Sequence, residues 1–173
     1  MRKILVVIDM QKDFVDGSLG TPEAAGIVDA VVNEIGEYAP ENIYATRDTH
    51  PENYLETQEG RKLPVVHCVK GTPGWEINEK VAAALQGAEV IDKPTFGSLI
   101  LAEKLAALAE KEEIQVTLVG LCTDICVVSN ALLIKAYLPE IPVRVKADCC
   151  AGVTPASHEA ALTTMKMCQI EVL

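Results

Sequence analysis

Two cysteines stand four residues apart in the stretch GLCTDICV, directly after the apolar run VTLV. If a helix begins after Thr123, Cys126 lies in its first turn, where unpaired N–H groups and the helix dipole favour a thiolate. A neighbouring carboxylate could accept the thiol proton, and a neighbouring ammonium could stabilise the thiolate. The pattern makes Cys126 a candidate nucleophile. Taken alone, Cys122 and Cys126 could also form a redox pair or be two small buried residues.

Other reactive side chains follow other apolar runs of the chain. Asp9 follows KILVVI, Asp48 and His50 follow NIYAT, and Lys93 follows AEVID. In doubly wound sheets, ligands bind beyond the carboxyl ends of the strands. If these runs are strands, they bring carboxylates, an imidazole, an amine and the thiols to one edge. This convergence is stronger support for a site than any single residue, since an acid after a strand often only caps a turn.

A second group combines Asp48 and His50 with His67, which follows 17 residues after His50. Carboxylate oxygen and imidazole nitrogen suit Zn, Fe or Mn, with waters completing the ligand set. We therefore expect one divalent metal ion as cofactor, its identity open. The alternative is that Asp48 caps a turn and that the two histidines are ordinary surface or core residues. No Cys-x-x-Cys accompanies them, which argues against a structural zinc knuckle.

The elements that must hold these residues alternate along the chain. Apolar, β-branched runs predict strands at 3–8, 42–46, 88–91, 115–120 and 143–147, with a closing strand within 168–173. Helical patterns follow Thr21-Pro22 to about residue 38, Ser98 over 99–113, Thr123 to about 138, and Thr154-Pro155 over 156–167. The alternation predicts an α/β fold of three layers, αβα, with a doubly wound, mostly parallel sheet of about six strands. Residues 47–81 form the one long irregular region, and such loops are usually functional.

Composition limits the classes of partner. A chain of 173 residues is expected to form one domain, 1–173. Its formal charge of −10 argues against nucleic acid or an anionic membrane as partner. The first apolar run is shorter than a signal peptide needs, and no stretch approaches the roughly 20 apolar residues of a membrane span. We expect a cytoplasmic protein whose six cysteines stay reduced.

Several of these stretches together resemble the cysteine hydrolases of the isochorismatase-like superfamily, most closely its nicotinamidase branch. IDMQKDFVDGSL, KPTFGS and GLCTDICV resemble the segments of the catalytic aspartate, lysine and cysteine, and ATRDTHP and HCVKGTPGWE resemble the metal-binding segments. The similarity covers nearly the whole chain and implies the Rossmann-like fold of that superfamily. It implies a catalytic triad of Asp9, Lys93 and Cys126, and metal ligands Asp48, His50 and His67.

The resemblance also implies how the substrate is bound. The backbone N–H groups of Cys122 and Cys126 are expected to form an oxyanion hole, with a cis peptide bond between Leu121 and Cys122. Nicotinamidases usually carry a tryptophan three residues before the last metal histidine, where this chain has Pro64. The only tryptophan, Trp75, either contacts the substrate from another direction or anchors its loop. The expected substrate contacts are Phe14, Trp75 and Leu121.

The implied activity is hydrolysis of a small carboxamide through a cysteine thioester, with nicotinamide, giving nicotinate and ammonia, as first choice. Another small amide or a ureido compound is the alternative within this chemistry. A metal-binding family member without turnover and a thiol redox protein are the alternatives from other classes. Since relatives commonly assemble, the chain is expected to be a homo-oligomer that binds a small-molecule amide.

Overall fold

The centre of the molecule is a sheet of six strands, all parallel, in the order β3-β2-β1-β4-β5-β6. The computed structural model describes residues 1–173. Every run predicted as a strand contains one, although β5 continues past the predicted end to Ala151. The strands are β1 (Arg2–Ile8), β2 (Ile43–Asp48), β3 (Glu89–Lys93), β4 (Ile114–Leu121), β5 (Val143–Ala151) and β6 (Glu171–Val172).

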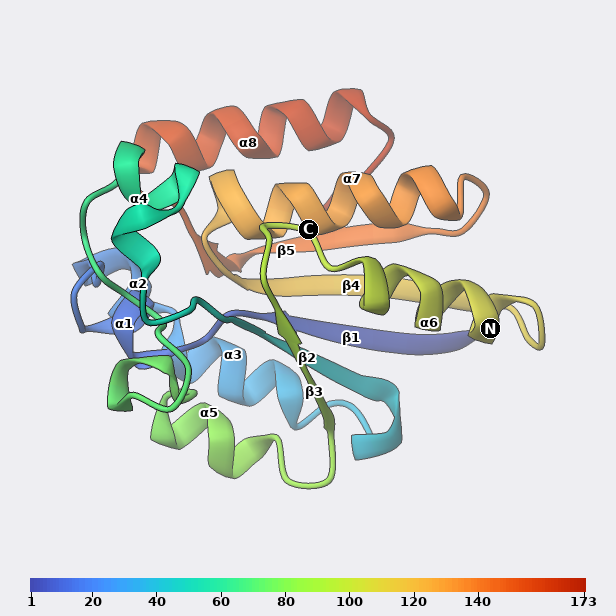
Figure 1. Ribbon diagram of the computed structural model, residues 1–173. Coiled ribbons are helices and arrows are strands. Elements are labelled where there is room, and N and C mark those ends of the chain that lie inside the picture. Colours follow the sequence, from blue (N-terminus) through green and yellow to red (C-terminus); the bar gives the residue numbers. More distant parts are fainter.

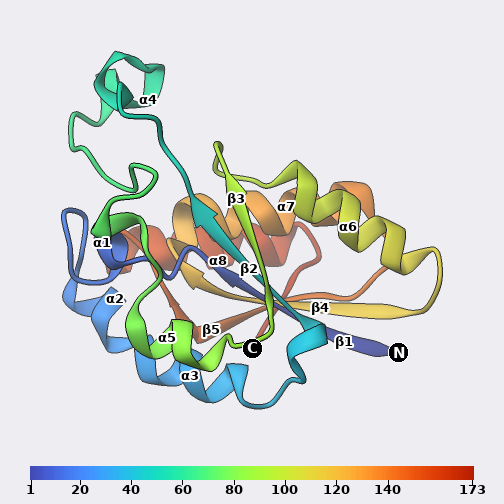
Figure 2. The ribbon, with the colours of Figure 1, turned by 60° about the horizontal axis from the view of Figure 1, so that its bottom comes forward.

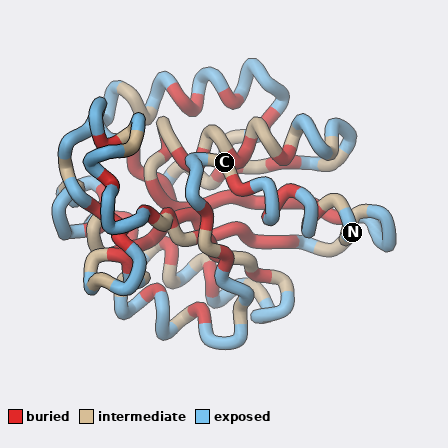
Figure 3. The backbone as a smooth tube through the Cα atoms, viewed as in Figure 1, coloured by how far each residue is buried: buried red, intermediate tan, exposed pale blue.

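Helices cover both faces of this sheet, which gives the three layers predicted from the sequence (Figure 1). On one face lie α6 (Leu99–Ala109), α7 (Val128–Tyr137) and α8 (Pro155–Met167), and on the other α3 (Val28–Ile35) and α5 (Glu79–Ala84). Successive residues of β1 point to opposite faces, so Leu5 and Val7 join one apolar core while Ile4 and Val6 join the other. Figure 3 shows the central strands β1 and β4 among the most deeply buried parts of the chain. No helix combines the length and the apolar character that crossing a bilayer requires.

Three of the predicted helix starts have side-chain caps. The capping oxygens of Thr21, Ser98 and Thr154 accept hydrogen bonds from the backbone N–H three residues on, at 3.0, 3.2 and 3.1 Å. Each such cap typically contributes about 1 kcal/mol. The helix predicted from Thr21 to about residue 38 is interrupted, because α2 (Pro22–Gly26) ends at a glycine and α3 begins at Val28. Glycine favours this break, since it is a poor helix former.

The region 47–81 carries three short helical turns rather than a long element. They are η2 (Tyr54–Glu56), α4 (Gln58–Lys62) and η3 (Pro73–Trp75). In Figure 2, α4 projects from the carboxyl ends of the strands, on the side where α1 (Lys12–Val15) lies. The strand order reverses between β1 and β4, and the crevice beyond such a switch point is where doubly wound sheets bind ligands.

Candidate active site

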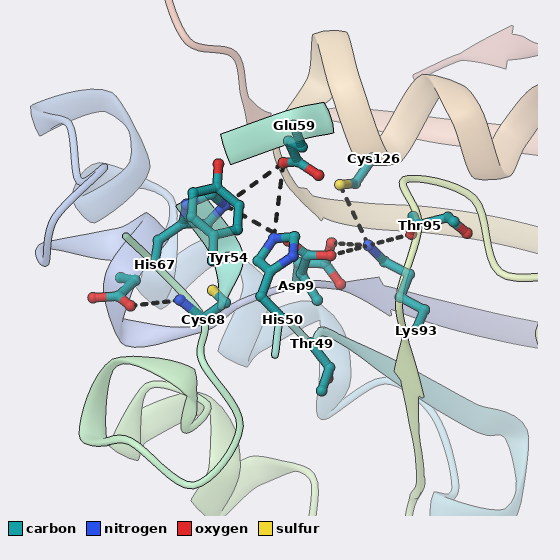
Figure 4. Close-up of polar contacts among 12 residues, drawn as sticks. Asp9, Thr49, His50, Tyr54, Glu59, His67, Cys68, Lys93, Thr95 and Cys126 are labelled. Atoms are coloured by element: carbon teal, nitrogen blue, oxygen red, sulfur yellow. Dashed lines mark hydrogen bonds and ion pairs between the residues drawn. The ribbon is translucent and has the colours of Figure 1, made fainter. Parts of the chain in front are cut away.

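Asp9, Lys93 and Cys126 meet at this switch point, from the ends of β1, β3 and the turn after β4. The Lys93 ammonium nitrogen lies 2.6 Å from Asp9 Oδ2 and 3.4 Å from Cys126 Sγ (Figure 4). It also donates to the Thr95 carbonyl at 3.1 Å. All three triad side chains are buried, with exposed fractions of 0, 1 and 4% for Asp9, Lys93 and Cys126. The structure therefore brings together the three residues that the sequence singled out.

Local structure holds each member in place. The Thr46 hydroxyl of β2 donates to Asp9 Oδ1 at 2.6 Å, which leaves the other carboxylate oxygen to Lys93. Cys126 lies in a π-helical turn, η4 (Thr123–Val127), that leads directly into α7. Such wide turns occur often at functional sites. The sequence predicted a helix here, but not the wider turn, and nothing in the spacing identified Thr46 as the partner of Asp9.

Burial and charge shift the ionisation of the triad in ways that suit proton transfer. Burial raises the pKa of Cys126 well above its ordinary value, and the neighbouring Asp9 charge adds to this while Lys93 opposes it. Burial also raises the pKa of Asp9, again against the effect of Lys93. For Lys93, burial alone would lower the pKa, but the charges of Asp9, Cys126 and Asp48 outweigh it and raise the pKa. Lys93 is therefore a permanent cation between these groups.

The segment before Cys126 has the form that the resemblance implied. The Leu121–Cys122 peptide bond is cis. Both Cys122 and Cys126 are free thiols, the first half-buried and the second buried. Burial raises the pKa of Cys122 to about 12, so its thiol is neutral. Of the other cysteines, Cys68, Cys149 and Cys150 are buried and Cys168 is exposed.

Asp48, His50 and His67 also come together, and Glu59 of α4 joins them. One ligand atom from each of these four residues lies within 4.8 Å of all the others. His50 Nε2 lies 2.9 Å from Asp48 Oδ2 and 3.8 Å from Glu59 Oε1, while His67 Nε2 lies 3.8 and 3.9 Å from the same two oxygens. Donors around one ion with bonds of about 2.0–2.2 Å have separations of this order.

Two further observations show that the group suits a cation. His50 Nε2 is buried and its close neighbours are carboxylate oxygens, Asp48 Oδ2 at 2.9 Å and Glu59 Oε1 at 3.8 Å, as expected of a nitrogen that shares a cation with them. His67 Nδ1 lies 2.8 Å from the Val65 carbonyl, and a carbonyl can only accept. The proton of His67 is therefore on Nδ1, so Nε2 keeps the lone pair that a metal needs. The donor set, two imidazoles and two carboxylates, fits a divalent ion such as Zn, Fe or Mn.

Glu59 is a possible metal ligand that the sequence did not reveal. Glu52 and Asn53, which follow His50 more closely in the sequence, are both exposed. Glu59 is brought in because Thr57 caps α4 through Gly60 N at 3.0 Å, which turns this helix over the histidines. The position of Glu59 near the two histidines therefore depends on how residues 47–81 fold.

A cavity of about 240 Å³ opens beside the triad and the metal-binding group. Cys122 and Cys126 line it from the nucleophile segment, and Asp48, Glu59 and His67 line it from the metal-binding side. The rest of its wall is largely apolar and includes Phe14, Leu19, Leu63, Phe96, Ile125 and Val153. Of the expected substrate contacts, Phe14 lies in this wall. Leu121 and Trp75 do not line it. Leu121 is fully buried in the core.

Trp75 is an anchor of its loop, the second of the two roles considered for it. Its indole N–H donates to the Thr49 hydroxyl at 2.9 Å, and the Arg47 guanidinium lies 3.7 Å from the ring centre. Such a cation over an indole face is attractive. The ring is held by β2 and the residue after it, and it does not line the cavity, so its contact with a substrate stays a prediction.

Comparison with known proteins agrees with this arrangement. A family model for the isochorismatase domain matches residues 3–173. The chain belongs to the isochorismatase family. An uncharacterized isochorismatase family protein of Bacillus subtilis, PncA, is 29% identical over 174 residues, covering 94% of this chain and 93% of the relative. The nicotinamidase/pyrazinamidase of Mycobacterium tuberculosis is 27% identical over 190 residues, covering 99% and 98% of the two chains.

A solved structure supports the same family assignment. The pyrazinamidase of Pyrococcus horikoshii, crystallised in complex with zinc, matches with a TM-score of 0.81 and 30% identity, over 100% of this chain and 99% of that one. The predicted isochorismatase-like fold and the resemblance to the nicotinamidase branch are both confirmed. In this family member, Asp9, Lys93 and Cys126 lie together beside the group of possible metal ligands.

Proposed function

We propose that this isochorismatase-family protein is an amidohydrolase that converts nicotinamide to nicotinate and ammonia. Relatives that are named nicotinamidase and pyrazinamidase support a hydrolase acting on amide bonds. The observation that carries the proposal is the position of Lys93, whose ammonium contacts Asp9, Cys126 and Asp48 beside the cavity. A thiol, a base and a fixed cation at the wall of a small cavity are the parts that covalent amide hydrolysis needs.

In the proposed mechanism, Asp9 accepts the proton of Cys126 and the thiolate attacks the amide carbon. Lys93 stabilises the thiolate and keeps Asp9 oriented. The backbone N–H groups of Cys122 and Cys126 bind the developing oxyanion, and one such donor is typically worth about 2.7–4 kcal/mol in the transition state. Asp9 then returns the proton to the departing nitrogen, which leaves as ammonia. Water, deprotonated by Asp9, hydrolyses the thioester and restores the thiol.

The metal-binding group would act on the substrate rather than replace the nucleophile. Asp48, His50, Glu59 and His67 would hold the ion, and a bound divalent ion supplies a Lewis acid for the ring nitrogen of the substrate or for a water. Asp48, Glu59 and His67 line the same cavity as Cys126, so a small molecule could contact both groups.

The cavity wall favours a neutral, flat substrate. No lysine or arginine lines the cavity, so the proposed metal ion is the only cation that a substrate carboxylate could meet at its wall. Phe14 and Phe96 supply aromatic surface, which suits a pyridine or pyrazine ring. Another small neutral carboxamide is the second candidate, because Trp75 lies outside the cavity and Pro64 replaces the tryptophan usual in nicotinamidases. A ureido acid is less favoured, because no lysine or arginine side chain lines the cavity to pair with its carboxylate.

A panel of small amides tests reaction class, substrate and metal together. Ammonia release is measured from nicotinamide, pyrazinamide, benzamide and an N-carbamoyl amino acid, each with and without a chelator, and with Cys126→Ala as the blank. We expect release from nicotinamide and pyrazinamide, loss of it after chelation, and none from the carbamoyl acid. Release from the carbamoyl acid alone would refute the substrate assignment, and release by the blank would refute the nucleophile.

The proposal also covers the cellular location and the oligomeric state of the protein. Six free cysteines suit a reducing compartment, and we propose a cytoplasmic location. We also propose a homo-oligomer, as relatives in this superfamily commonly assemble. Cell fractionation and light scattering on the purified chain test the two statements separately.

A further inference from the structure

Asn130 is a polar residue on the buried side of α7, and the proposed mechanism gives it no role. It is fully buried, with 0% of the residue exposed, in a segment whose other buried residues include Val127, Ala131 and Ile134. Asparagine is a poor helix former, and a buried amide is costly unless its hydrogen bonds are satisfied. Its partners therefore indicate what it does.

The Asn130 side chain makes three hydrogen bonds, and they reach two different segments. Its amide nitrogen donates to the Cys126 carbonyl at 2.8 Å and to the Phe96 carbonyl at 3.0 Å, and its oxygen accepts from Ser98 N at 2.9 Å. Both amide hydrogens face carbonyls and the oxygen faces an N–H, so only one orientation of the amide fits. Asn130 thus joins the residue that carries the nucleophilic thiol to the loop 94–98.

Two residues of that loop, Thr95 and Phe96, reach the site. Its Thr95 carbonyl accepts from the Lys93 ammonium at 3.1 Å, and its Phe96 forms part of the cavity wall. The loop lies directly on α7, because a Cβ added to Gly97 would lie 3.3 Å from Leu133 Cδ2 and 3.5 Å from the Ser129 carbonyl. The Asn130 amide therefore binds the backbone of Cys126 and also the loop whose Thr95 carbonyl accepts a hydrogen bond from Lys93.

We propose that Asn130 is a positioning residue of the hydrolysis, which sets the separation between the thiol of Cys126 and the ammonium of Lys93. The proposal rests on the proposed function, in which Cys126 is the nucleophile. The 3.4 Å contact between these two groups joins a side chain of β3 to one of η4, and no other side-chain hydrogen bond links the Cys126 backbone to the loop after Lys93. Losing the amide should let the two backbones separate, and a shift of about 1 Å can cost a reaction roughly a hundredfold.

Two variants and one control test this role. Asn130→Leu removes all three hydrogen bonds at similar volume, and Asn130→Asp keeps the shape and the bond from Ser98 N but loses both donors. The control is Ser98→Ala, which removes the cap of α6 but leaves the backbone N–H that binds Asn130. For each protein we measure melting temperature, kcat and KM for nicotinamide, and the pH profile of Cys126 alkylation by iodoacetamide, with the modified peptide identified by mass.

We expect both Asn130 variants to lose about tenfold to a hundredfold in kcat, with KM nearly unchanged, and to alkylate more slowly with a profile moved to higher pH. Ser98→Ala should have a lower melting temperature but keep the wild-type kcat and the wild-type pH profile of alkylation. Wild-type kcat and profile in a folded Asn130 variant would overturn the proposal, and so would losses no larger than those of Ser98→Ala. Alkylation requires no substrate, so it tests Asn130 even if nicotinamide proves to be the wrong amide.

Discussion

Replacing Lys93 with methionine removes the one cation at the centre of the site at nearly constant volume. The ammonium lies 2.6 Å from Asp9 Oδ2 and 3.4 Å from Asp48 Oδ1, and only 1% of the residue is exposed. Removing one partner of a buried ion pair leaves an uncompensated charge, which costs about 3–5 kcal/mol. We expect Lys93→Met to lose unfolding free energy in this range at pH 8 and to lose ammonia release.

The loss of stability should shrink as the pH falls. Burial already raises the pKa of Asp9, and Lys93 is the main influence that lowers it, so the pKa should rise further in the variant. A carboxyl whose folded-state pKa lies above its unfolded value costs stability when charged, and this cost appears as pH rises between the two values. Lys93→Met should therefore recover part of its stability between pH 8 and pH 5.5.

Urea denaturation of the metal-free chain at both pH values measures these effects. The matched control is Lys104→Met, the same change at an exposed pair, where Lys104 lies 3.0 Å from Glu89. Exposed pairs contribute little, so the control should unfold almost as the wild type does at either pH. Equal losses in the two variants, or a loss in Lys93→Met that does not change with pH, would refute the argument from buried charge.

Three further outcomes are expected. Cys126→Ala should abolish ammonia release and keep the circular dichroism spectrum of the wild type; measurable turnover would exclude the thiol as nucleophile. His50→Ala and Glu59→Gln should each lower the divalent metal content per chain found by elemental analysis, whereas Glu52→Gln should not; an unchanged content in Glu59→Gln would remove Glu59 from the ligand set. Thr154→Ala should cost about 1 kcal/mol in urea denaturation, because α8 loses its capping oxygen, and should leave kcat unchanged.

The sequence predicted the positions of the reactive groups because those groups follow strands. Once KILVVI, NIYAT, AEVID and QVTLVG are strands of one parallel sheet, their carboxyl ends must lie at one edge. Asp9, Asp48, Lys93 and Cys126 come together for that reason, whatever the loops between them do. Capping residues gave the helix starts in the same way, since the Thr-Pro pairs and Ser98 act within a few residues of their own position.

The sequence could not predict contacts that depend on how irregular segments fold over the sheet. Glu59 reaches the histidines through α4, a short helix in the long loop, and no periodicity marks it. Trp75 looked available for a substrate because it is the only tryptophan, but Thr49 and Arg47 hold it. Thr46 sits in a strand whose pattern shows that it is buried but not that it bonds Asp9. Loops and cross-strand partners are set by tertiary packing rather than by local pattern.

The charges of the site explain why the proposed base, Asp9, and the proposed nucleophile, Cys126, must act together. With both carboxylates ionised and the thiol neutral, Asp9, Asp48 and Lys93 carry one net negative charge in a buried space. A thiolate formed by losing its proton to bulk water would add a second, which burial opposes, as the raised pKa of Cys126 indicates. Passing the proton to Asp9 leaves the net charge of the group unchanged. The same burial that makes Cys126 a weak acid also makes Asp9 a stronger base, so the difference between their pKa values matters more for thiolate formation than either value alone.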